Sequence, residues 1–178
     1  MVRLRSSASH VPREAELKFQ SQNSCGLRAD KLQESLTIMR HFGLDLLLLQ
    51  ETWLLTTNEN DLWDHDGYLV VEHGLSVKLC KRGSLGLATV LNVHCRAAFE
   101  RAGYQKTTFV DRIMDLRLMF RDDRGQKLLF YVVNSYAPYN ASTSKSRLLL
   151  ERYYDDLLDC LDARDPCHGH RCQRLYGH

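Results

Sequence analysis

The order of apolar and polar residues predicts a strand followed by a helix near the start of the chain. Residues 17–22, LKFQSQ, alternate apolar and polar side chains in part, with the period of a half-buried strand. Between Asp30 and Phe42, apolar residues recur at steps of four and three, and Gly43 follows as a stop. The predicted apolar face of this helix comprises Leu32, Leu36, Met39 and Phe42.

A continuous apolar run comes next and ends in polar residues. Residues 45–50, DLLLLQ, are too short and too uniformly apolar for a surface helix, so they predict a strand buried on both faces. Strand, helix and strand in this order indicate a layered α/β domain. The buried strand delivers the carboxylate of Glu51 at its end.

Short strand patterns fill the middle of the chain. Residues 56–67 are polar and predict a loop. Five later segments have the alternation or the apolar character of strands: 68–73, 76–80, 85–93, 109–120 and 127–136. A final helix is predicted over residues 144–162, with an apolar face that comprises Leu149, Tyr153, Leu157 and Leu161.

Composition limits the class of protein without naming a function. The 178 residues are 44% hydrophobic, which suits one globular domain. Basic and acidic residues nearly balance at 24 and 22, so no global basic field indicates nucleic acid, and none excludes it. The six cysteines have no repeated spacing, which predicts reduced thiols. Without a signal-peptide pattern or a membrane span, we expect an intracellular protein with no membrane partner, whether nuclear or cytoplasmic.

Polar residues stand at the ends of three predicted strands. Asn23 follows the first strand, Glu51 follows the buried strand, and Asn134 and Tyr136 end a later one. In open α/β sheets, functional groups collect at the carboxyl ends of strands, so these side chains could converge. Each also has an ordinary structural explanation: a solvated glutamate, a turn asparagine or a packed tyrosine. The pattern alone names no function.

Several ordered segments together resemble the endonuclease/exonuclease/phosphatase superfamily, and most closely the endonuclease domain of non-LTR retrotransposons. They are QNSCGL, DLLLLQETW, GSLGLATVL, DRIMDLRL and VVNSYAPYN. The resemblance spans about residues 17–162. It implies an α/β fold: the N-terminal portion of a four-layer α/β sandwich with mixed, largely antiparallel sheets, truncated. It also implies hydrolysis of phosphodiesters, with DNA as substrate and Mg2+ or Mn2+ as cofactor.

The resemblance assigns roles to three residues. Glu51 corresponds to the family's metal-binding glutamate, and Asn23 to an asparagine that serves both the metal and the catalytic groups. Tyr136 corresponds to a catalytic tyrosine that contacts the reacting phosphate. Mg2+ prefers carboxylate oxygens together with phosphate and water, which agrees with a glutamate at this position.

The sequence also departs from the family. Gln22 stands where the family commonly has tryptophan, and neither the Gly-Asp-x-Asn nor the Ser-Asp-His motif occurs. We therefore expect an inactive fragment with weak metal binding at most, rather than a working phosphodiesterase. Two further hypotheses stay open: a pseudoenzyme that binds nucleic acid or protein, and a small metal-binding module built on Cys167, His168, His170 and Cys172.

Three regions are expected along the chain. Residues 1–15 predict a disordered basic arm, residues 16–163 a partial domain, and residues 164–178 an irregular tail. A frameshift offers one explanation of the tail, because decoding its last residues in a shifted frame permits an Asp-Val-Asn sequence where the family motif belongs. Oligomeric state is open.

Overall fold

The computed structural model describes residues 17–54, 62–74, 85–109, 112–138, 142–162 and 172–177. In chain order the elements are β1 (Phe19–Asn23), α1 (Ala29–Phe42), β2 (Leu46–Gln50), β3 (Leu62–His65), β4 (Tyr68–His73), β5 (Leu87–Leu91), α2 (Val93–Arg101), β6 (Lys106–Phe109), β7 (Ile113–Arg121), β8 (Lys127–Ser135), α3 (Ser144–Asp162) and β9 (Cys172–Gly177).

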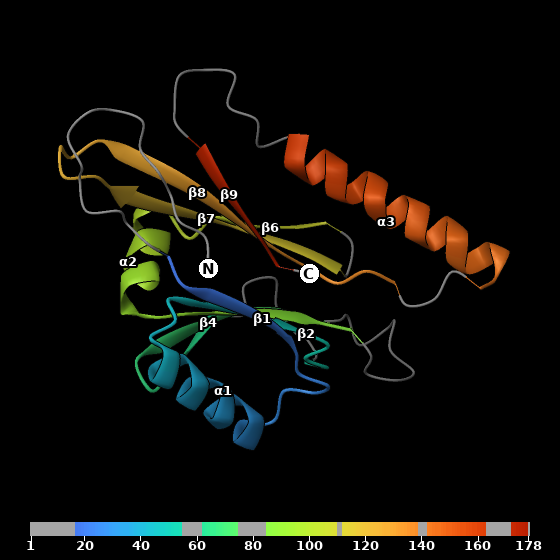
Figure 1. The fold of residues 1–178 in the computed structure, drawn as a ribbon, viewed down its shortest axis with the longest axis horizontal. Coiled ribbons are helices and arrows are strands. Elements are labelled where there is room, and N and C mark those ends of the chain that lie inside the picture. Colours follow the sequence, from blue (N-terminus) through green and yellow to red (C-terminus); the bar gives the residue numbers. More distant parts are fainter. Residues whose placement is uncertain are drawn as a thin grey trace.

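The strands form two sheets. The first sheet has the order β1-β2-β5-β4-β3, and the second has the order β6-β7-β8-β9. The β1/β2 and β8/β9 pairs are parallel, and all other pairs are antiparallel. The sheets lie face to face, with α1 outside the first and α3 outside the second, so the chain has four layers (Figure 1). The predicted α/β sandwich with mixed sheets is confirmed.

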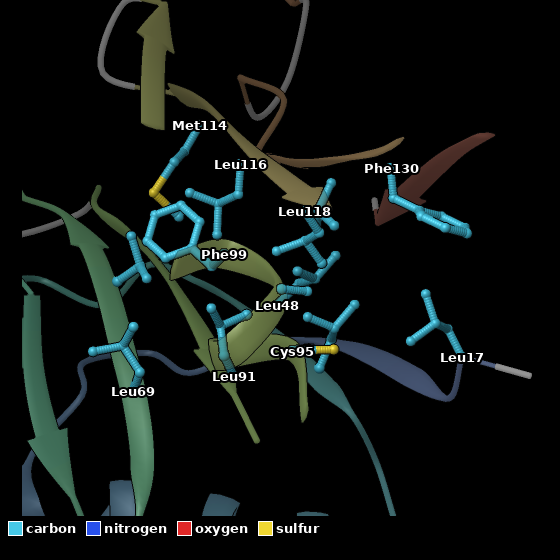
Figure 2. Packing of buried hydrophobic residues seen from close by; sticks show 14 of the residues in the cluster. Leu17, Leu48, Leu69, Leu91, Cys95, Phe99, Met114, Leu116, Leu118 and Phe130 are labelled. Atoms are coloured by element: carbon cyan, nitrogen blue, oxygen red, sulfur yellow. The ribbon is translucent and has the colours of Figure 1, made fainter. Parts of the chain in front are cut away.

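The interior strand β2 contributes to two hydrophobic cores. Leu46 and Leu48 face the space between the sheets, whereas Leu47 and Leu49 lie against α1. All four leucines are fully buried, as the continuous apolar run predicts. The core between the sheets also receives α2, whose Phe99 packs among residues of β5 and β7 (Figure 2). This packing fixes the strand that carries Glu51 from both sides.

Each of the two predicted helix faces includes a residue that lies outside the buried face. On α1 the steps of four and three that join Leu32, Leu36 and Met39 lead on to position 43, so Phe42 lies off the face and is 60% exposed. On α3 a strict step of four drifts around a helix of 3.6 residues per turn. Leu149 is therefore 51% exposed. The buried residues of α3 are Tyr153, Leu157 and Cys160.

Some elements were not predicted. The expected loop 56–67 contains the edge strand β3, and the polar segment after β5 forms α2 and β6. Asn92 starts α2, because its side-chain oxygen accepts hydrogen bonds from the backbone N–H groups of His94 and Cys95. Within the described ranges, no helix combines the length and hydropathy of a bilayer span.

The expectation of an irregular tail is wrong for six residues. Cys172–Gly177 forms β9, which pairs in parallel with β8 and so satisfies backbone groups along one edge of that strand. Residues 1–16, the expected strand 76–80, and residues 163–171 with His168 and His170 lie outside the described residues. The frameshift and the domain boundaries stay predictions.

Candidate active site at the ends of β1, β2 and β8

The three residues that the sequence singled out come together at one edge of the sandwich. Asn23 is the last residue of β1, Glu51 follows β2, and Tyr136 follows β8. The hydroxyl of Tyr136 donates a hydrogen bond to Oε1 of Glu51. Asn23 is linked to Glu51 through Cys25, whose Sγ lies 3.3 Å from Asn23 Oδ1 and 3.8 Å from Glu51 Oε2. The constellation therefore includes a thiol that sequence reasoning missed.

Strand pairing explains why distant residues meet. Parallel pairing of β1 with β2 sets Asn23 beside Gln50, so the next residue, Glu51, emerges next to the β1 end. Tyr136 comes from the second sheet, where its backbone N–H donates to the carbonyl oxygen of Arg112 at 3.0 Å. The site therefore lies where strand ends of the two sheets meet.

The backbone that follows β2 is held on two sides. The carbonyl oxygen of Glu51 accepts a hydrogen bond from Gly26 N at 2.7 Å, and Thr52 N donates to the carbonyl oxygen of Gly86 at 3.1 Å. Cys25 and Glu51 both have positive φ angles, 46° and 51°, which L residues adopt at a cost of about 1–3 kcal/mol. Such a conformation persists when neighbouring contacts dictate it, and these hydrogen bonds supply those contacts.

Two buried amide side chains, those of Gln50 and Asn134, form a hydrogen-bond network next to Glu51. Gln50 Nε2 donates to Ser21 Oγ and to Asn134 Oδ1, both at 2.9 Å. Asn134 Nδ2 in turn donates to the carbonyl oxygen of Ala88 at 2.9 Å. Buried polar groups are stable only when hydrogen-bonded, so this network ties β8 to the first sheet directly beside the site. Asn134, one of the predicted strand-end residues, therefore links the two sheets beside the site.

Two of the segments that carry the resemblance contact each other. Gly26, in QNSCGL, lies against the indole of Trp53, in DLLLLQETW. A Cβ at position 26 would lie 2.5 Å from Trp53 Cε3, and the φ of Gly26 is +91°. Only glycine fits both the backbone conformation and the space, which explains why this loop can close over the end of β2.

The Glu51 carboxylate raises the pKa of Tyr136. The hydrogen bond to Glu51 is the largest cause that raises the pKa of Tyr136 to about 12, and burial and the negative charge of Glu51 add to it. The Arg112 guanidinium, 5.6 Å from the centre of the Tyr136 ring, lowers this pKa in part. The phenol keeps its proton at neutral pH and serves as a hydrogen-bond donor, not as a general base.

The donor set fits a hard divalent cation in part. Glu51 supplies a carboxylate and Asn23 a neutral amide oxygen, the ligand types that Mg2+ and Mn2+ accept. Among the residues that the structure describes, no group of three or more His, Cys, Asp or Glu side chains gathers at this or any other point. Glu51 and Asn23 therefore form two corners of a coordination shell that needs water, phosphate or further protein ligands.

No family model and no curated protein matches the sequence. Several solved structures share its fold. AP endonuclease LMAP from Leishmania major has a TM-score of 0.61 and 21% identity over 99% of this chain. The Xenopus laevis APE2 catalytic domain gives 0.57 and 18% over 90% of this chain. The 3′ phosphatase NExo from Neisseria, bound to a product DNA hairpin, gives 0.54 and 13% over 90%.

These matches establish the fold of the chain. The described sheets and helices have the arrangement found in AP endonucleases and in this 3′ phosphatase. The chain spans 59% of LMAP, 57% of the APE2 catalytic domain and 57% of NExo. At these identities the matches show the fold alone, and they support the expected α/β sandwich.

Proposed function

We propose that this chain carries the glutamate, asparagine and tyrosine of a divalent-metal-dependent phosphodiesterase site that acts on DNA. The observation that carries the proposal is the convergence of Asn23, Glu51 and Tyr136 from three strand ends. Support comes from the structures that share the fold, which include AP endonucleases and a 3′ phosphatase with a DNA hairpin.

Each side chain has a distinct task in this proposal. Glu51 holds the cation through its carboxylate, and Asn23 offers its amide oxygen as a second ligand. The phenolic O–H of Tyr136 donates a hydrogen bond to Glu51 in the free site, and to a non-bridging phosphate oxygen once substrate is bound. A bound Mg2+ or Mn2+ supplies charge neutralisation at the phosphate. Arg112 adds positive charge beside the same ring.

The resemblance supports a finer assignment as well. The segments DLLLLQETW and VVNSYAPYN favour the endonuclease type of non-LTR retrotransposons over repair enzymes. The 178 residues contain neither a Gly-Asp-x-Asn nor a Ser-Asp-His motif, and the proposal includes that this polypeptide does not hydrolyse DNA by itself. General acid or base action accounts for roughly a hundredfold or more of a hydrolytic rate, and Tyr136 is protonated and so provides no base.

A nicking assay tests this part of the proposal. Supercoiled plasmid is incubated with Mg2+ and either the 178-residue polypeptide or its Glu51→Ala variant. We expect the two to nick at equal rates, no faster than buffer with Mg2+. Nicking that requires Mg2+ and that Glu51→Ala abolishes would instead establish a working phosphodiesterase and refute inactivity. Circular dichroism of both proteins controls for folding.

A further inference from the structure

We propose that the outer face of α3 is a self-association surface, on which the α3 helix of a second copy of this chain packs in the antiparallel direction. The inference goes beyond the proposed function, because the surface contains none of the residues of the candidate active site. The exposed residues of the outer face are Lys145, Leu148, Arg152, Asp155, Leu158, Asp159 and Asp162.

The first half of α3 is rich in leucine but buries none of it. Residues 144–152 contain three consecutive leucines, yet no side chain of this range is buried, and the first buried residue of the helix is Tyr153. Leu148 is 66% exposed, and Leu158, further along the helix, is 57% exposed. In Figure 1 the N-terminal end of α3 extends beyond the strands of the second sheet. Large apolar side chains that stay exposed in this way indicate a contact surface.

Helix periodicity places the exposed leucines and the charges on one side of α3. From Lys145 the chain reaches Leu148, Arg152 and Asp155 by steps of three, four and three. Leu158 follows Asp155 at a further step of three. Residues three and four apart are neighbours on a helix of 3.6 residues per turn, so these side chains form one continuous strip.

The charges of α3 are divided between its two halves. Residues 144–152 carry three basic residues and one acidic residue, a net charge of +2, whereas residues 153–162 carry four aspartates and no basic residue, a net charge of −4. One half of the helix repels a partner of uniform charge. A second α3 that runs in the opposite direction presents its acidic half to the basic half of the first. The charge pattern is therefore complementary to itself, as an isologous two-fold contact requires.

This order of charges is unfavourable for a helix on its own. A helix is stabilised by acidic residues near its N-terminus and by basic residues near its C-terminus, because of its dipole. The first turn of α3 contains no acidic residue, and its last turn contains no basic residue. In contrast, α1 has Asp30 in its first turn, and Arg40 and His41 in its last. An antiparallel second α3 supplies acidic residues beside the N-terminal end and basic residues beside the C-terminal end.

The positions of the charges set the register of the pair. With the two-fold axis near the middle of the helix, Lys145 lies opposite Asp162 of the second copy, and Arg152 lies opposite Asp155. The same register brings Leu148 next to Leu158. The 19 residues of α3 span about 28 Å, so two such helices bury less than the roughly 1,600 Å² of a standard interface. We expect a weak dimer, with a dissociation constant in the micromolar range.

Sedimentation equilibrium of the 178-residue protein between about 1 and 300 μM tests the inference. A reducing agent prevents disulfide formation by the exposed Cys25 thiol. We expect a monomer–dimer equilibrium, whose dissociation constant rises about tenfold or more in Leu148→Ser. Phe42→Ser is the matched control, because Phe42 is a similarly exposed apolar residue on α1, at 60%, and it should leave the equilibrium unchanged. A wild type that stays monomeric would overturn the inference, and so would association that Phe42→Ser abolishes and Leu148→Ser does not.

Two charge-reversal variants test the antiparallel direction. Lys145→Asp/Arg152→Asp makes the outer face acidic along its length, and Asp155→Lys/Asp162→Lys makes it mainly basic. Each variant alone should dimerise about tenfold more weakly or less, because like charges then face each other, and an equimolar mixture should form a heterodimer. Both variants suit the helix dipole, so α3 should stay folded, which circular dichroism checks. Self-association that persists unchanged in both variants, or a mixture that stays monomeric, contradicts the antiparallel contact.

Discussion

The helices that cover the two sheets differ in how well their apolar side chains are buried. Over the first sheet, α1 buries Leu32, Leu36 and Met39, which are 2%, 0% and 1% exposed. Over the second, α3 buries Tyr153, Leu157 and Cys160 in a small cluster. The outer residues of α3 include large apolar side chains that stay exposed: Leu148 at 66%, Leu149 at 51%, Tyr154 at 50% and Leu158 at 57%.

This difference indicates which residues of the candidate site lie in the more stable part of the fold. Asn23 ends β1 and Glu51 follows β2, a strand that is buried on both faces, whereas Tyr136 follows β8 in the less completely covered sheet. Local opening requires less free energy where few apolar contacts are lost. We therefore expect the metal-ligating side of the site to be the more stable one, with α3 the first element to open.

The largest expected effect is in the buried strand β2 of the first sheet. Leu48→Ala removes a fully buried side chain between the sheets and should lower the free energy of unfolding by about 2–5 kcal/mol. The matched variant Leu158→Ala, on the exposed side of α3, should change it by less than about 0.5 kcal/mol. Urea denaturation measures both. Equal losses would remove the contrast between the two sheets.

The next effect concerns the network that joins the sheets. Asn134→Leu removes one of the two acceptors of Gln50 Nε2 and the side-chain donor to the carbonyl oxygen of Ala88, which should destabilise the fold by about 1–3 kcal/mol. A surface amide change, Gln126→Ala, provides the control, with an expected effect within about 0.5 kcal/mol. Thermal denaturation followed by circular dichroism compares the two. An Asn134→Leu protein as stable as the control would show that the network does not join the sheets energetically.

A smaller effect separates backbone strain from side-chain contact. Alanine at Gly26 or Gly125 forces an L residue into positive φ, at a cost of about 1–2 kcal/mol each. Only Gly26 adds a clash, with the Trp53 indole, whereas Gly125 faces open space. Gly26→Ala should therefore be the more destabilising variant, and it should shift the Trp53 fluorescence. If Gly125→Ala is equally destabilising, the close contact between Gly26 and the Trp53 indole does not contribute to the free energy of unfolding.

The smallest expected effect concerns the ionisation of the Tyr136 phenol. The pKa of Tyr136 lies at about 12, above its usual 10, so the stabilisation linked to the protonated phenol is complete below pH 10. It is lost as pH rises through about 12. Glu51→Gln should lower this pKa, because the hydrogen bond to the carboxylate is its main cause. Tyrosinate absorbance, with Tyr136→Phe subtracted, gives the value. An unchanged pKa in Glu51→Gln would contradict the Tyr136–Glu51 contact.

Much of the first sheet could be predicted because its apolar pattern reflects burial directly. The run Leu46 to Leu49 is apolar because both faces of β2 are covered, and Glu51 was identified by its place after that run. The β3 edge strand escaped prediction because only one face is partly covered, so its sequence is as polar as a loop. The helix α2 is short and rich in charged residues, with a weak apolar face.

The candidate site was predictable only in part. Asn23, Glu51 and Tyr136 stand at strand ends, which the sequence shows, and the family resemblance assigned them a common role. Cys25 could not be found in this way. Its thiol reaches Asn23 and Glu51 because the backbone at residue 25 has a φ of 46°, a local conformation that no periodicity encodes.

Titration with Mn2+, followed by water-proton relaxation, tests the central claim most directly. Wild type and a Glu151→Gln control, altered at an exposed carboxylate on α3, should bind one Mn2+ with the same affinity. Glu51→Gln keeps the size of the side chain but removes the charge, and it should weaken binding by about tenfold to a hundredfold or more. Binding by Glu51→Gln that equals the wild type would show that the ends of β1, β2 and β8 do not form a divalent-cation site.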